Sequence, residues 1–228
     1  MTFTVGRSVQ GRAIQAHLFA GPLKHTVLVF GGFHGDEPKS VFVARQFIEL
    51  LGARRGAAQG ARWVVVPLVN PDGYAKRKRR NARRVDINRN FPTKNWMLGS
   101  RRGRMFGGPT PASEPETRAV MAAVHRFRPA RIVTIHSIGA ERYCNNYNGP
   151  GRALALALAM RRHNRYPVTA SIGYPTPGSF GAWAGVEHDI PTITLELPSR
   201  HSPKRCWEEN LQALLCVARF PCYRARPY

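Results

Sequence analysis

Short apolar runs alternate with longer amphipathic stretches along this chain, which is the pattern of an α/β protein. Residues 26–30 (TVLVF) are apolar or β-branched throughout and are followed by two glycines, so they predict a buried strand. Similar runs predict further strands at residues 62–69, 131–135, 168–172 and 192–197. The sequence therefore predicts an α/β sandwich.

Helices are predicted between these strands. Pro38 suits the first turn of a helix that continues through VFVARQFIELL. Ser113 and Glu116 have the spacing of a capping box, which predicts a helix from there to about residue 127. Two more helices are expected at residues 152–164 and 207–217.

Residues 74–112 show neither the apolar–polar alternation of a strand nor the repeat of an amphipathic helix. They are basic, with many glycines and prolines. They follow the strong turn signal NPDG at residues 70–73. A structureless segment of this length in a compact domain is usually functional or disordered. We expect a functional loop, because the polar segment VDINRNFP at residues 85–92 lies inside it.

Composition limits the classes of protein that this chain can belong to. Its 228 residues, 43% of them apolar, suffice for one sizeable core, and we expect a single domain over residues 1–228. No apolar run approaches membrane-spanning length, and the N-terminal residues lack the layout of a secretory signal. The four cysteines show no CxxC pairing and are expected to be reduced. These features predict a cytoplasmic protein with no membrane partner.

The formal net charge of +22 is unusual for this length, and arginine supplies most of it. Basic runs occur at residues 76–80 and 101–104. A positive field attracts anions such as acidic peptides, nucleic acid or cell-wall fragments, but a merely solvated basic surface has the same composition. Charge alone therefore identifies no partner.

Candidate metal ligands follow the predicted strands. His34 and Glu37 have HxxE spacing just after residues 26–30, and His136 follows residues 131–135. Two imidazoles and a carboxylate are the ligands of an open catalytic zinc site, so these residues predict one Zn²⁺ per chain. Glu196 lies in the otherwise apolar ITLELP, where a carboxylate is costly unless it faces a polar cavity. Beside zinc, Glu196 is the expected general base.

Two arginines in the basic loop are candidates for contacts with a substrate. The guanidinium of Arg89 suits a terminal carboxylate, which it can grip with two parallel hydrogen bonds. Arg79 is a candidate for stabilising the oxyanion that forms on a scissile carbonyl. Residue chemistry alone also allows both to be ordinary surface charges.

The ordered series HGDE, NPDG, VDINRNFP, IHS and LELP resembles the zinc carboxypeptidase family, the funnelins, over nearly the whole chain. The resemblance implies an α/β/α sandwich with a mixed central sheet. It also implies zinc on His34, Glu37 and His136, with Glu196 as general base and acid. The chain departs from the family pattern at Arg84, where glycine is common.

The same resemblance assigns substrate contacts to the loop residues. It implies that Asn88 and Arg89 hold the substrate's free carboxylate and that Arg79 stabilises the oxyanion. Tyr174, 22 residues before Glu196, matches the family's mobile substrate-binding tyrosine.

GYPTPGSFGAW followed by PTITLELP is similar to a bacterial subgroup of the family that cleaves the γ-D-glutamyl–meso-diaminopimelate bond of murein peptides. We therefore predict this activity in cell-wall recycling, with an anionic murein peptide as substrate. The alternatives are a metallocarboxypeptidase that releases C-terminal L-amino acids and a zinc deacylase of N-acyl amino acids. A nucleic-acid-binding protein is the alternative from another class, although no binding motif accompanies the arginines.

Overall fold

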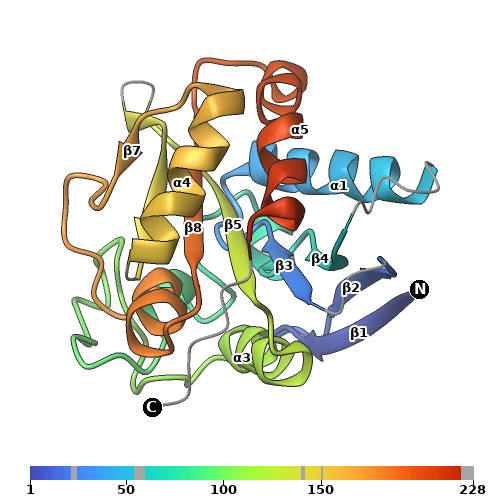
Figure 1. Ribbon diagram of the computed structural model, residues 1–228. Helices are drawn as coiled ribbons and strands as arrows, with labels where there is room; N and C mark the ends of the chain where they lie inside the picture. Colours follow the sequence, from blue (N-terminus) through green and yellow to red (C-terminus); the bar gives the residue numbers. More distant parts are fainter. Residues whose placement is uncertain (22–24, 54–59, 140–141, 150, 222–228) are drawn as a thin grey trace, which may run out of the picture.

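One eight-stranded sheet runs through the protein in the order β1-β2-β4-β3-β5-β8-β6-β7 (Figure 1). A computed structural model describes residues 1–21, 25–53, 60–139, 142–149 and 151–221. The strands are β1 (Thr2–Arg7), β2 (Ala13–Phe19), β3 (Thr26–Phe30), β4 (Arg62–Val66), β5 (Arg131–Ile138), β6 (Cys144–Asn148), β7 (Val168–Thr169) and β8 (Thr192–Pro198).

The sheet is parallel at its centre, has antiparallel pairs on both sides of it, and ends in a short parallel pair of β6 with β7 at one edge. Strands β4, β3, β5 and β8 run parallel, whereas β2 pairs with β4, and β6 with β8, in the antiparallel sense. The prediction of a mixed central sheet is confirmed. Buried central strands are apolar on both faces, which explains why β3 is apolar along its whole length.

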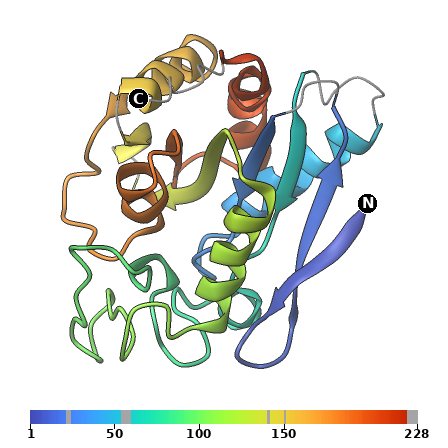
Figure 2. The same cartoon turned by 60° about the horizontal axis from the view of Figure 1, so that its bottom comes forward.

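Helices cover both faces of the sheet (Figures 1 and 2). On one face lie α1 (Pro38–Ala53), α4 (Gly151–Asn164) and α5 (Pro203–Arg219). On the other lie α3 (Pro115–Phe127) and the π-helix η3 (Ala182–Glu187). The shorter α2 (Pro71–Ala75) leads into the long basic region, and the 3₁₀-helix η1 (Ile87–Arg89) lies inside it.

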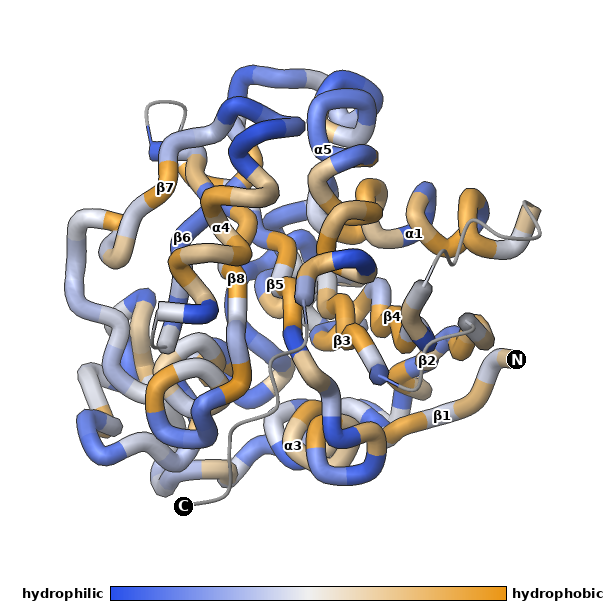
Figure 3. The backbone as a smooth tube through the Cα atoms, viewed as in Figure 1, coloured by the Kyte–Doolittle hydropathy of each residue, from blue (hydrophilic) through white to orange (hydrophobic). Residues whose placement is uncertain are grey.

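Alternate residues of each central strand supply the two hydrophobic cores. Val27 and Val29 of β3 belong to the core under α1, α4 and α5, whereas Leu28 and Phe30 belong to the core under α3 and η3. Figure 3 shows the apolar segments gathered on the central strands and on the helices beside them. No described helix is long and apolar enough to cross a bilayer.

The capping box predicted at Ser113 and Glu116 is wrong. Helix α3 begins at Pro115, and the Ser113 hydroxyl donates to the carboxylate of Glu114 at 2.8 Å. The Glu116 carboxylate accepts instead from the backbone nitrogen of Val9 at 3.0 Å and from Asn81 at 3.1 Å. Contacts with distant segments therefore replace the local hydrogen bonds of the motif.

The long basic loop is held in place by neutral amides. Asn81 donates to the buried carboxylates of Glu114 and Glu116, at 2.7 and 3.1 Å. Asn90 donates to the carbonyl oxygens of Gly107 and Thr110, at 2.7 and 3.0 Å. Asn81 thus joins the start of the loop to α3 and to the residue before it, and Asn90 ties the middle of the loop to its end.

Arg84 occupies a conformation that favours glycine. Its φ of +63° lies in the left-handed region, and its backbone nitrogen donates to the carbonyl of Asn81 at 2.9 Å. This hydrogen bond closes the turn although an arginine occupies the position. Asp86, two residues later, belongs to the site described below. The strain of a non-glycine residue in this region is about 1–3 kcal/mol.

We expect Arg84→Gly to raise the free energy of unfolding by about 0.5–1 kcal/mol, because relief of strain exceeds the added flexibility of the unfolded chain. Urea denaturation of the wild type and the variant at equal metal loading measures this change in the free energy of unfolding. The matched control is Arg83→Gly, at an exposed neighbour with no positive φ, which should be neutral or destabilising. An equal loss of stability in both variants would contradict the assignment of strain to Arg84.

Candidate active site

His34 and Glu37 lie on the turn between β3 and α1. The Ser40 hydroxyl donates to the carbonyl oxygen of Glu37 at 2.7 Å and accepts from the backbone nitrogen of Gly32 at 3.1 Å. One side chain in the first turn of α1 therefore fixes both ends of the turn. The turn lies at the carboxyl end of β3, and binding sites of open parallel sheets lie at this end of the strands.

Two motif glycines allow the backbones of distant turns to touch. A Cβ atom at Gly35 would lie 2.0 Å from the carbonyl carbon of Gly73, and one at Gly73 would lie 2.7 Å from the carbonyl oxygen of Arg80. No side chain fits at either position. The HGDE and NPDG segments consequently pack directly on each other, which brings the start of the basic loop to His34.

His136 and Glu196 are direct partners on the adjacent parallel strands β5 and β8. Residues paired in this way project from the same face of a sheet. Their side chains are buried, with exposed fractions of 2% and 5%. The sheet register alone therefore places a candidate metal ligand beside the candidate base.

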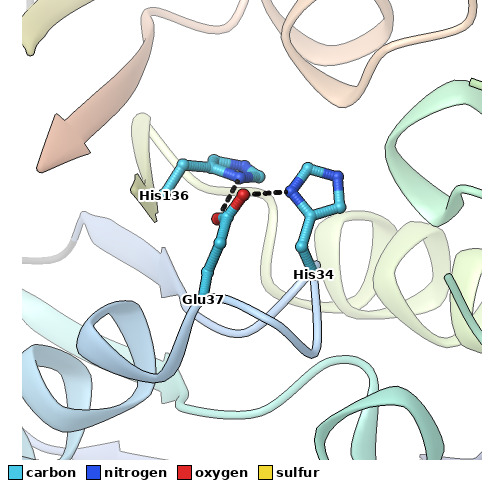
Figure 4. A group of neighbouring side chains, drawn as sticks. All are labelled: His34, Glu37 and His136. Carbon is cyan, nitrogen blue, oxygen red and sulfur yellow. Dashed lines mark hydrogen bonds and ion pairs between the residues drawn. The ribbon is translucent and has the colours of Figure 1, made fainter. Parts of the chain in front are cut away.

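Glu37 joins the two histidines (Figure 4). Its carboxylate oxygens lie 2.7 Å from His34 Nδ1 and 3.2 Å from His136 Nδ1. One donor atom from each of the three residues lies within 4.8 Å of the others. The structure thus brings together the three predicted ligands, from a turn and a strand about 100 residues apart.

Asp86 supports this cluster from behind, a role that the sequence did not reveal. Its carboxylate lies 3.1 Å from His34 Nε2 and accepts from Arg79 Nε at 3.0 Å. Metal-binding histidines usually have such a partner on their second nitrogen. The only signal in the sequence is an acidic residue two positions before Asn88, and its contact with His34 depends on the path of the loop.

Burial and charge oppose each other in this cluster. Burial favours the neutral form of Glu37, but the neighbouring His34 and His136 outweigh it and hold the pKa of Glu37 well below its usual range. Burial also opposes protonation of His34, but Glu37 and Asp86 raise its pKa. Burial lowers the pKa of His136. The carboxylates therefore stay ionised and require a positive charge between them.

The pKa of Glu196 is shifted in the opposite direction to that of Glu37. Burial, together with the negative charge of Glu37, raises the pKa of Glu196 to about 8. A carboxyl group with a pKa near the working pH can both accept and donate a proton. This property suits general acid–base catalysis.

All eight predicted site residues line one cavity of about 390 Å³. They are His34, Glu37, Arg79, Asn88, Arg89, His136, Tyr174 and Glu196. The same cavity is lined by polar residues that were not predicted, namely Asn146, Asn148, Ser179 and Thr194.

The loop residues present their polar groups to this cavity. Arg89 is buried, its Nη1 donates to the carbonyl oxygen of Asn88 at 2.6 Å, and its Nε has no partner among the described residues. The side-chain oxygen of Asn88 accepts from the backbone nitrogen of Phe180 at 2.8 Å, which leaves its amide nitrogen to donate. Arg79 is held by Asp86, and its Nη1 lies 3.5 Å from Glu37.

Sequence comparison agrees with this geometry. The profile described as "Zinc carboxypeptidase" matches residues 1–212. The chain belongs to the zinc carboxypeptidase family. It is a peptide hydrolase, and the predictions of family and enzyme class are confirmed.

Among characterised relatives, murein peptide amidase A of Escherichia coli (strain K12) is 34% identical over 204 residues, which cover 85% of this chain and 79% of that protein. The human carboxypeptidase N catalytic chain is 29% identical over 170 residues, covering 59% of this chain and 37% of the relative. The similarity thus extends over most of the bacterial amidase and over a smaller share of the human enzyme.

Solved structures show the same fold. The crystal structure of the murein-tripeptide amidase MpaA from Escherichia coli O157 aligns with a TM-score of 0.78 at 30% identity, covering 99% of this chain and 93% of that one. Bovine thrombin-activatable fibrinolysis inhibitor aligns with a TM-score of 0.81 at 20% identity, covering 96% and 89%. The zinc carboxypeptidase-like α/β/α sandwich is confirmed.

The raised pKa of Glu196 predicts a pH-dependent stability. Because the folded pKa of about 8 exceeds the ordinary value of 4.5, the folded protein retains a proton that the unfolded chain releases between these values. In excess chelator, we expect the free energy of unfolding of the wild type to fall relative to that of Glu196→Gln as the pH rises from about 4.5 to about 8. Glu208→Gln, at an exposed position on α5, should show no such trend.

Urea denaturation in a series of buffers measures this difference. A constant difference between the wild type and Glu196→Gln over the whole pH range would contradict the shifted pKa.

Proposed function

We propose that this protein is a zinc-dependent murein peptide amidase that hydrolyses the γ-D-glutamyl–meso-diaminopimelate amide bond. The observation that carries this proposal is the convergence of His34, Glu37 and His136 beside Glu196 in one cavity. Similarity to murein peptide amidase A over 85% of the chain supports the choice of substrate. A cytoplasmic location and a role in cell-wall recycling stay predictions.

The three ligand residues fit zinc by their own chemistry. Two imidazoles and one carboxylate form the donor set of an open catalytic zinc site, which keeps a position for water or substrate. Asp86 fixes the ring of His34 from its second nitrogen, as expected of a metal ligand. When bound, zinc supplies Lewis acidity and lowers the pKa of water.

Glu196 moves the proton in this mechanism. It accepts a proton from the attacking water and delivers it to the nitrogen of the leaving diaminopimelate as the amide bond breaks. Its place on β8, fixed by pairing with His136 on β5, keeps the carboxylate beside the metal ligands through both transfers. Its buried place beside the metal ligands lets the same carboxylate take up a proton and later deliver it.

Arg79 stabilises the negative charge that develops on the carbonyl oxygen. Asp86 holds Nε and Nη2 of Arg79 at 3.0 Å, so the guanidinium plane is oriented before substrate binds. The remaining Nη1 lies near Glu37 and thus near the scissile carbonyl. Donors oriented in advance stabilise a transition state without reorganisation.

Arg89 and Asn88 bind the free carboxylate of the leaving residue. The unpartnered Nε of Arg89 and the free amide nitrogen of Asn88 are the donors that such a group requires. Because this anchor binds a free carboxylate, the enzyme acts at chain ends. Tyr174 lines the same cavity from the loop before η3 and covers the bound substrate.

The first test is hydrolysis of L-Ala-γ-D-Glu-meso-diaminopimelate by the purified, zinc-loaded protein. We expect release of free diaminopimelate, abolished by chelator and restored by zinc, and a fall in kcat of about 10²–10⁴-fold in Glu196→Gln. Mass spectrometry of the products identifies the bond that is cleaved. Glu208→Gln should retain full activity.

Release of C-terminal L-amino acids from ordinary peptides, with no cleavage of the murein tripeptide, would reject the amidase and leave the zinc hydrolase. Undiminished activity in Glu196→Gln would reject the mechanism.

The second test concerns Asp86. We expect Asp86→Asn to weaken zinc binding by about 10–100-fold, because the neutral amide no longer orients and polarises His34. Competition with a chromophoric chelator measures the affinity. The matched control is Asp72→Asn, since Asp72 is equally buried but contacts Ser8 and Arg12 instead. Equal weakening in both variants would show an effect on folding alone.

A further inference from the structure

Arg104 lies at the rim of the active-site cavity, on the side of Arg89. It lines the cavity together with Met105, whose sulfur accepts a hydrogen bond from Arg89 Nη2 at 3.8 Å. The side chain of Arg104 is exposed and has no hydrogen bond or ion pair among the described residues. We propose that Arg104 binds a second carboxylate of the leaving residue and so selects dicarboxylic substrates.

The backbone that carries Arg104 is fixed before substrate binds. Arg80 Nη1 donates to the carbonyl oxygens of Arg101 and Gly103, at 3.2 and 3.0 Å. The nitrogen of Gly103 donates to Ser100 at 2.8 Å, which closes the turn. An arginine on a fixed turn loses less freedom on binding than one on a loose segment.

Charge is distributed unevenly in the cavity. The only carboxylates that line it within the described chain are Glu37 and Glu196, both at the metal-ligand end. Three arginines line it as well, and each has a different environment. Arg79 is already paired with Asp86, whereas Arg89 is buried, with an Nε that has no partner among the described residues, and is assigned to the first carboxylate. Arg104 is therefore the cation left for a second anionic group.

Polar residues of β6 and β8 that line the cavity support the same choice of leaving residue. Asn148 donates to the hydroxyl of Thr194 at 3.1 Å, and Asn146 donates to the carbonyl oxygen of Thr169 at 3.0 Å. Amides and hydroxyls can bind the polar end of a side chain, but they offer little to an aromatic one. Within the described chain, no carboxylate other than Glu37 and Glu196 lines the cavity, so none is available to select a lysine or arginine side chain.

This inference rests on the proposed function, since it takes Arg89 as the anchor of the first carboxylate. The test compares murein tripeptide with the same peptide amidated on the distal carboxyl group of diaminopimelate. We expect Arg104→Gln to raise KM for the dicarboxylic substrate by about threefold to tenfold, the range of an exposed charge-assisted pair. The kcat and the KM for the amidated substrate should stay unchanged.

Arg102→Gln is the matched control, because Arg102 is an exposed neighbour that does not line the cavity. It should leave both substrates unaffected. Equal effects of the two variants, equal effects on the two substrates, or no effect of Arg104→Gln would each overturn the proposal.

A binding measurement separates this inference from the proposed function. Calorimetric titration of the zinc-loaded protein with free diaminopimelate and with its distal monoamide requires no turnover. The wild type should bind the free dicarboxylate more tightly, and Arg104→Gln should remove the preference. If neither peptide is hydrolysed, the proposed function fails while the titration still decides the role of Arg104. Equal affinity of the wild type for both ligands would reject that role.

Discussion

The pairing of β5 with β8 is the constraint on which the site depends. It places His136 beside Glu196 through the backbone hydrogen bonds of the sheet, so no mobile loop separates the ligand from the base. Glu37 is tied to the same strand, because its carboxylate accepts from the backbone nitrogen of Ser137 at 3.0 Å. The turn after β3 is thereby anchored to β5 at the metal-binding end. Catalytic geometry follows from the rigidity of the central sheet.

Electrostatics explains why this arrangement requires a cation. Glu37 and Asp86 are buried carboxylates on either side of His34, and burial of unpaired charge is costly. Glu37 and Asp86 raise the pKa of His34, which favours a compensating proton on its ring in the metal-free protein. A divalent ion held by His34, Glu37 and His136 would supply the compensating charge instead, which would link metal binding to proton release. The guanidinium of Arg79, which contacts Asp86 and lies near Glu37, adds further positive charge beside these two carboxylates.

The sequence indicated residues that the structure brings together, because each stands at a strong local signal. His34 comes after an apolar run that ends in two glycines, and Glu196 is the only charged residue of β8. The role of Asp86 was not predictable, because its contact with His34 spans 52 positions and depends on the loop. The capping box failed for the same reason, since Val9 and Asn81 lie far from Glu116 in sequence. Strands β1 and β2 were missed although they alternate apolar with polar residues, as expected of strands with one face on the core, and β6 was missed as well.

In the basic loop, the residues that fix the path of the backbone are mostly different from those that supply the positive charge. Its path is fixed mainly by the neutral amides of Asn81 and Asn90, which bind buried carboxylates and carbonyl oxygens. Arg80 is an exception, because it holds the turn before Arg104. Most other cations of the loop are exposed and contribute to the field at the cavity mouth rather than to the fold. A chain with a net charge of +22 can therefore keep an ordered loop, because the contacts that order it are largely independent of that charge.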